Sequence, residues 1–128
     1  MGPERAVRMS PTGDALRCNL PFTLHNDTFV TPIDPLLLVW SAVNRLSYGG
    51  RDLGKAEQGI PVLEALKGIT INAARQGFEE GVKGSIEPGK FADFVVLDEN
   101  PLAVDPMHLK DIEIAATIVG DVLAYGAL

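Results

Sequence analysis

Residues 69–102, ITINAARQGFEEGVKGSIEPGKFADFVVLDENPL, hold the change of pattern that decides the fold. Small and apolar residues at helical spacing predict a helix over residues 61–76, with Gly77 as its C-terminal cap. Beyond Gly77 a Pro-Gly turn leads into the apolar run of residues 94–97, which predicts a strand. The sequence therefore predicts that the chain changes from helical to β structure at this point.

Upstream of this stretch the pattern is mostly helical. Residues 5–18 predict two short helical pieces, because a proline and a glycine interrupt their periodicity. Residues 21–25 predict a short strand. A longer helix is expected over residues 35–46, with Asp34 as its N-cap and a proline at its first position.

Downstream, the residues are typical of a small β unit. Residues 105–112, DPMHLKDI, predict a polar turn or short helix. The segments 112–120 and 122–126 predict two closing strands. Gly120 and Asp121 occupy the turn position of a hairpin between them. We expect one unit over residues 1–76 and a second over residues 77–128.

The composition excludes several classes of protein. The 128 residues carry 17 acidic against 11 basic side chains, for a net charge of −6. An acidic chain without a basic patch is unsuited to binding nucleic acid. No apolar run is long enough to span a membrane, and the N-terminus does not resemble a signal peptide. A cytoplasmic location is the default expectation, and the single cysteine, Cys18, is expected to be buried and inert.

A histidine and a carboxylate lie two residues apart at the end of the predicted strand. Because side chains alternate along a strand, Thr23, His25 and Asp27 share one side, whereas Leu24 points to the other. One interpretation is that His25 and Asp27 belong to a metal or catalytic centre. The alternative is a polar strand end, in which the two side chains bind each other or a helix N-terminus. The residues alone leave both open.

Three stretches together resemble a known family. Residues 69–102 resemble the C-terminal signature of the amidohydrolase superfamily, with its Gly-x-Ile, Pro-Gly-Lys and Ala-Asp elements. Residues 24–45, LHNDTFVTPIDPLLLVWSAVNR, are similar to the amidohydrolase 3, YtcJ-like branch, as are residues 2–11. Two positions depart from the family pattern, since Asn26 replaces the usual serine and Asp121 replaces a glycine.

The resemblance implies a fold class for this chain. Family members combine a (β/α)8 barrel with a β-sandwich built from both chain ends. The chain would be an α/β segment from the C-terminal part of such a protein. Residues 1–76 would supply the last barrel strand and its flanking helices. Residues 77–128 would supply a small antiparallel β unit of the composite sandwich.

The resemblance also implies an activity. It matches Asp27 to an aspartate that binds a divalent metal, most commonly zinc, and accepts the proton of the attacking water. The substrate would be a small molecule with an amide-type C–N bond. His25 would lie beside that substrate. The remaining metal ligands of the family are absent here, where His108 is the only other histidine and is expected at the surface. The isolated chain is therefore expected to bind no metal and to be inactive.

Two arginines near the predicted site are candidates for binding the substrate. Arg45 and Arg51 flank a glycine-containing loop and could contact an anionic group of a substrate, with solvated surface positions as the alternative. Arg45 is the one predicted to bind substrate. A second function is also open, because one barrel strand cannot close a barrel and leaves strand edges and apolar faces uncovered. The chain could then be a non-catalytic interaction module that forms a homodimer or higher oligomer.

Overall fold

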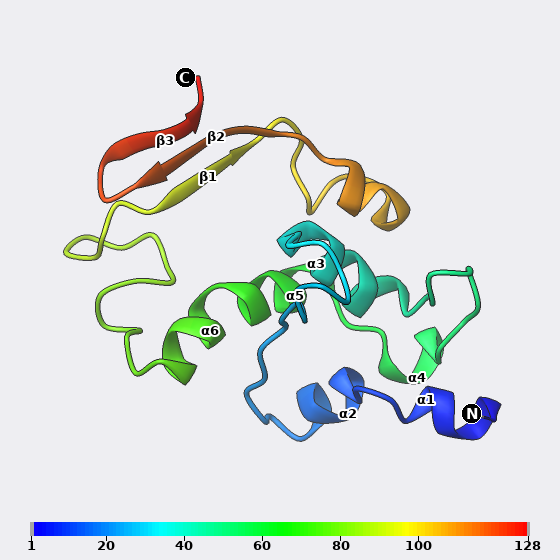
Figure 1. The fold of residues 1–128 in the computed structure, drawn as a ribbon. Coiled ribbons are helices and arrows are strands. Elements are labelled where there is room, and N and C mark those ends of the chain that lie inside the picture. Colours follow the sequence, from blue (N-terminus) through cyan, green and yellow to red (C-terminus); the bar gives the residue numbers. More distant parts are fainter. Residues whose placement is uncertain (1, 128) are drawn as a thin grey trace.

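The computed structural model describes residues 2–127, which begin with two short helices. Helix α1 covers Pro3–Val7 and α2 covers Thr12–Arg17, so the prediction of two helical pieces is confirmed (Figure 1). Cys18 follows α2 and is exposed, so the prediction that it is buried was wrong. The apolar spacing that suggested burial continues only over the six residues of α2, and Cys18 lies just beyond the last of them.

Helix α3, Pro35–Asn44, is the central helix of the structure. Its predicted N-cap is confirmed, because Asp34 is extended and its Oδ1 accepts a hydrogen bond from the Leu37 amide at 3.1 Å. The helix ends two residues before the predicted position, where Arg45 adopts a left-handed conformation with φ 53°. A left-handed residue ends the run of helical hydrogen bonds.

We expect Asp34→Ala to lower the free energy of unfolding by about 1 kcal/mol, because the Leu37 amide loses its acceptor. Asp34→Asn is the matched control, since its amide oxygen can accept the same hydrogen bond. Urea denaturation followed by circular dichroism measures both changes. Equal losses for the two variants would show that the cap does not stabilise this helix.

A fourth helix, α4 (Lys55–Gln58), follows the predicted glycine loop and was not predicted. Asp52 stabilises the start of this helix, because its Oδ1 accepts hydrogen bonds from the Gly54 amide at 2.7 Å and the Lys55 amide at 2.9 Å. Gln58 then binds α4 to α2, since its side-chain amide donates to Asp14 Oδ2 at 2.9 Å. Four residues are too few to produce a periodic sequence signal.

The single helix predicted over residues 61–76 is broken into α5 (Val62–Ile69) and α6 (Ile71–Gln76). Thr70 interrupts it with φ −123° and ψ −99°, and its hydroxyl donates to the Leu66 carbonyl at 2.8 Å. A threonine hydroxyl that bonds the preceding turn competes with the helical backbone. Local hydrogen bonding therefore overrides the apolar periodicity.

The segment predicted as a strand, residues 21–25, is extended but belongs to none of the assigned strands. Its hydrogen bonds go to helices instead. The Leu24 amide donates to the Gly68 carbonyl at 3.1 Å, and Asn72 Nδ2 donates to the Phe22 carbonyl at 3.0 Å. A strand needs a neighbouring strand, and within residues 2–127 the sheet forms elsewhere. The strand prediction is corrected to an extended segment docked on α5 and α6.

The β unit is a three-stranded antiparallel sheet in the order β1-β2-β3 (Figure 1). Its strands are β1 (Phe94–Leu97), β2 (Ile114–Val119) and β3 (Val122–Gly126). Gly120 and Asp121 have φ values of 56° and 69°, which suit a two-residue hairpin turn with both residues left-handed. The predicted hairpin is confirmed, and aspartate tolerates the position that a glycine was expected to fill.

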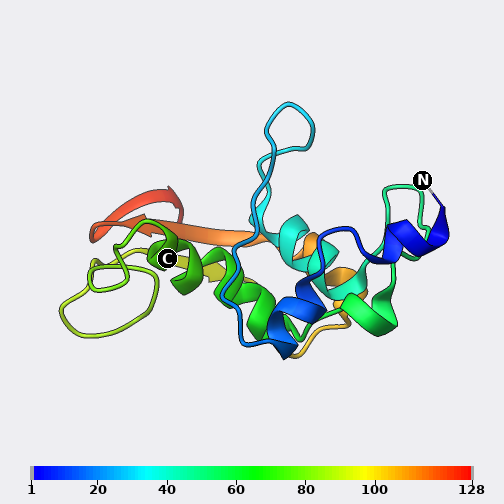
Figure 2. The same cartoon turned by 90° about the horizontal axis from the view of Figure 1, so that it is seen from below.

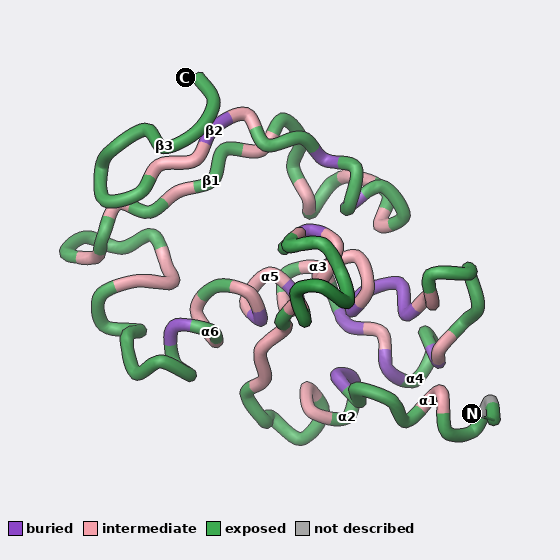
Figure 3. Tube along the Cα trace, viewed as in Figure 1, coloured by how far each residue is buried: buried purple, intermediate pink, exposed green. Residues whose placement is uncertain are grey.

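The core lies where α3 packs against α5 and against the 3-10 helix η1, Pro106–Asp111, which confirms the predicted short helix (Figure 3). Its buried apolar residues are Leu36, Val39, Ala42, Val43, Ile60, Ala65, Leu109 and Ile112. Two hydrogen bonds join η1 to α3: Trp40 Nε1 donates to the Met107 carbonyl at 2.9 Å, and Asn44 Nδ2 donates to the Pro106 carbonyl at 2.8 Å. Residues from both predicted units share this core, and the boundary between them stays a prediction.

No helix within residues 2–127 has the length and apolar character that crossing a membrane requires.

Candidate functional site

Asp27 lies at the end of the extended segment and is exposed. Its carbonyl accepts hydrogen bonds from the Val30 amide at 2.8 Å and the Thr31 amide at 3.2 Å, which turn the chain into the loop of residues 28–34. Among the described residues, no hydrogen bond or ion pair engages its carboxylate. The side chain is thus free to accept a proton or to bind a ligand.

His25 is also exposed, but it does not contact Asp27 through a hydrogen bond or ion pair within residues 2–127. Its Nδ1 lies 3.0 Å from the Asn26 carbonyl, an acceptor for the Nδ1–H tautomer. Asn26 in turn accepts a hydrogen bond from the Thr31 hydroxyl through its Oδ1, at 3.3 Å. The interpretation in which His25 and Asp27 bind each other is therefore not what the structure contains.

Arg45 is in a different environment from that expected of a substrate ligand. It is 7% exposed, and its guanidinium donates to three backbone carbonyls: Nη1 to Ser10 at 3.1 Å, and Nη2 to Leu53 at 3.2 Å and to Met9. Burial lowers the pKa of this guanidinium, which the nearby Asp52 carboxylate partly offsets. Arg45 ties the N-terminal segment to the end of α3, and its predicted substrate contact stays a prediction without geometric support.

His108, the second histidine, lies on η1 and is exposed as predicted. Its Nδ1 lies 3.5 Å from Asp111 Oδ2, and Lys110 donates to the other oxygen of that carboxylate at 2.7 Å. The hydrogen bond from Lys110 is the main reason that the pKa of Asp111 falls below its usual value. This group is a solvated surface cluster.

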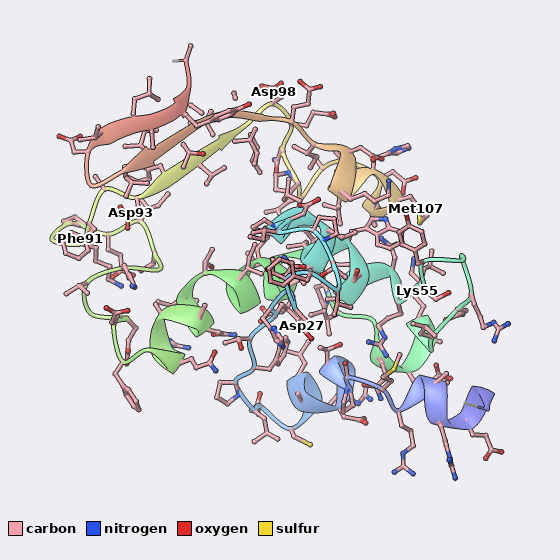
Figure 4. All side chains as sticks on the ribbon, viewed as in Figure 1. Asp27, Lys55, Phe91, Asp93, Asp98 and Met107 are labelled. Carbon is pink, nitrogen blue, oxygen red and sulfur yellow. The ribbon has the colours of Figure 1, made fainter. Side chains whose placement is uncertain are left out.

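The residues that the structure describes do not form a metal site by themselves. Within residues 2–127, no three His, Cys, Asp or Glu side chains gather closely enough to hold an ion. Figure 4 shows Asp27 well separated from Asp93 and Asp98 of the β unit. Metal sites in hydrolases need at least three protein ligands. Asp27 could supply one oxygen ligand, and the rest would have to come from outside this chain.

A comparison with protein families identifies the chain. The model of the Amidohydrolase family matches residues 1–125. The chain belongs to the amidohydrolase family. The resemblance seen in the sequence is thereby confirmed at the level of the family.

Two curated amidohydrolase relatives indicate how much of the family this chain represents. It is 37% identical to the putative amidohydrolase YtcJ of Bacillus subtilis over 103 residues, which is 78% of this chain and 19% of that protein. It is 29% identical to the N-substituted formamide deformylase of Arthrobacter pascens over 122 residues, which is 95% of this chain and 22% of that protein. The chain spans about a fifth of the length of these relatives.

Solved structures of amidohydrolases agree with the fold. An uncharacterised metal-dependent hydrolase from Pyrococcus horikoshii matches with a TM-score of 0.69 and 30% identity, over 84% of this chain and 22% of that one. An amidohydrolase from Thermotoga maritima matches with a TM-score of 0.65 and 20% identity, over 99% and 27%. The second likeness shows the fold alone. The first supports a divalent metal as the cofactor of the family.

The sequence prediction overlooked the apolar residues that follow Asp27. Phe29, Val30 and Ile33 are all strongly exposed, at 104%, 77% and 76%. Three large apolar side chains lie within the five residues 29–33, on both sides of Pro32 and soon after a polar segment, and this was the signal available in the sequence.

Proposed function

We propose that this chain is the C-terminal segment of a metal-dependent amidohydrolase that hydrolyses amide-type C–N bonds, and that it is inactive by itself. The observation that carries the proposal is the family match over residues 1–125 in a chain that spans about a fifth of its relatives' length. The metal-binding side chains are consistent with this proposal. Within residues 2–127 no group of three possible ligands gathers around Asp27, and a metal site needs about three, so the others would come from the rest of the complete protein.

In the proposed reaction Asp27 acts as the general base. Its carboxylate is exposed and free of partners among the described residues, as a group that must take a proton from water needs to be. The bound metal, for which zinc is the first candidate, would lower the pKa of that water. His25 precedes Asp27 by two residues and is the candidate for a substrate contact.

The named relatives support the type of bond that is cleaved. The Arthrobacter pascens protein is an N-substituted formamide deformylase, and a deformylase of that kind breaks an amide C–N bond. We therefore propose a small amide as the substrate class of the complete protein. A cytoplasmic location is part of the same proposal.

The test compares the 128-residue chain with the complete product of its reading frame. We expect the complete product to purify with a stoichiometric divalent metal, measured by plasma mass spectrometry, and to hydrolyse members of a panel of N-substituted formamides and acetamides. The chain alone should show neither property. A complete product without metal and without hydrolysis of any amide would refute the proposal.

One observation favours the second function, a non-catalytic oligomerising module. Cross-strand pairing places Val95 beside Thr117 and Tyr125, and Val119 beside Val122, on one face of the sheet. The valines and the tyrosine are between 56% and 66% exposed. An uncovered apolar sheet face recruits another chain, which here would be a second copy.

We expect the isolated chain to form a homodimer or higher oligomer at micromolar concentration, as measured by multi-angle light scattering. Val122→Glu, in the apolar face, should shift it to a monomer because the carboxylate cannot be buried there without a partner. Ile86→Glu is the control, since Ile86 is also exposed, at 83% against 66% for Val122, but lies outside the sheet. A monomeric wild-type chain would refute this second function.

A further inference from the structure

The 3-10 helix η1 lies against α3, and the sheet extends away from this contact (Figures 1 and 2). Leu109 of η1 and Ile112, which follows it, are 0% and 6% exposed, and both belong to the core around α3. Within residues 2–127 the three strands contact one another and make little direct contact with the helices. The sheet is therefore attached to the helices mainly through η1.

Two side chains of α3 bind the backbone of η1. Trp40 Nε1 donates to the Met107 carbonyl at 2.9 Å, and Asn44 Nδ2 donates to the Pro106 carbonyl at 2.8 Å. Asn44 is 0% exposed, and Lys55 Nζ donates to its Oδ1 at 3.1 Å. A single buried amide thus connects α3, α4 and η1. Its removal would leave buried polar groups without partners, which costs more than the hydrogen bonds themselves contribute.

The helix to which η1 is bound is the one that follows Asp27 and its loop. Leu36 in the first turn of α3 and Val43 in the last are both buried in the same core as Leu109. Because protein cores are closely packed, a helix buried along its whole length keeps one position relative to the residues that cover it. The attachment of η1 therefore bears on the helix next to the candidate base.

We propose that η1, Trp40 and Asn44 form a joint that makes α3, α5 and the sheet one cooperative folding unit, in which neither the helices nor the sheet opens without the other. The predicted boundary at residues 76–77 is then a change of secondary structure and not a domain boundary. A molecule that binds only the folded sheet would also stabilise α3, because ligand binding stabilises the whole unit that opens together. This inference does not depend on the proposed function.

Native-state hydrogen exchange of the 128-residue chain, measured by NMR at increasing urea concentrations, tests the joint from both sides. In the wild type, the amides of α5 and β2 should converge on one opening equilibrium. Asn44→Ala, on the helical side, should lower the protection of both sets by the same factor of about 10-fold or more. Ile112→Val, on the side of the sheet, should lower both sets equally by about 2- to 10-fold, because it removes one buried carbon.

Asn100→Ala is the matched control. Asn100 is an exposed asparagine in the segment that leads to η1, and its Oδ1 accepts a hydrogen bond from the Leu102 amide of its own turn at 2.9 Å. Its replacement should change the protection of either set by less than about 2-fold. Trp40→Phe replaces Asn44→Ala if that variant does not fold. It removes one donor and should lower both sets equally by about 2- to 10-fold.

Equal losses in α5 and β2 for the joint variants, with Asn100→Ala unchanged, support the joint. Protection that falls only on the substituted side would overturn it: β2 unaffected by Asn44→Ala or Trp40→Phe, or α5 unaffected by Ile112→Val. A wild-type chain in which the two sets exchange through separate openings at every urea concentration, or in which neither set is protected, would overturn it as well.

Discussion

Asp27→Asn in the complete protein is expected to lower kcat on amide substrates by about 10²- to 10⁴-fold, the range that a general base contributes. Asparagine has nearly the same shape as aspartate but cannot take a proton from water. Because the Asp27 carboxylate has no partner within residues 2–127, the change should leave the free energy of unfolding of the chain almost unaltered. Steady-state kinetics and urea denaturation measure the two effects.

Asp98→Asn is the matched control for this experiment. Asp98 is an exposed aspartate that directly follows strand β1, in a separate part of the molecule (Figure 4). Its replacement should change kcat less than about 2-fold, since surface substitutions away from a site have small effects. If Asp27→Asn and Asp98→Asn behave alike, Asp27 is not the general base.

Arg45→Leu is expected to lower the free energy of unfolding of the chain by about 2 to 3 kcal/mol. The substitution removes a charged donor from three carbonyls, and hydrogen bonds to charged groups stabilise more than neutral ones. Water can replace part of this loss, because Met9 and Ser10 are exposed. Urea denaturation of the 128-residue chain measures the change in the free energy of unfolding.

Arg51→Leu serves as the control, since Arg51 is the other arginine of the same glycine loop and is exposed. Its effect on unfolding should stay within about 0.5 kcal/mol. The pair also tests the predicted substrate contact. If Arg45 bound substrate, Arg45→Leu would raise KM of the complete protein while leaving the free energy of unfolding unchanged, contrary to what we expect.

Local signals predicted the elements that depend on neighbouring residues. Asp34 followed by a proline predicted the start of α3, because a cap needs only the next few residues. Gly120 and Asp121 predicted the hairpin, because both tolerate the left-handed conformation that its turn requires. Element ends were less accurate, as for α3, since its C-terminus depends on the contacts of Arg45.

The errors concern features that depend on distant residues. The apolar run at residues 21–25 indicated a strand, but a strand exists only with a neighbour, and the chain docks this segment on helices instead. The break in the helix over residues 61–76 is a local exception, because the Thr70 hydroxyl donates to the Leu66 carbonyl four residues earlier. Cys18 was expected to be buried, but it follows the last residue of α2 and is exposed, although Leu16 of the same helix packs against the core.

The sequence by itself determined the family, the residue types at the candidate site and most local elements, because motifs, caps and turns are encoded in adjacent residues. It thereby identified Asp27 as the candidate base. Only the tertiary structure decided that Arg45 is bound to backbone carbonyls and that Phe29 is exposed beside Asp27. Burial and hydrogen-bond partners arise from segments far apart in the chain, such as residues 9–10 and 53 around Arg45, and no local pattern records them.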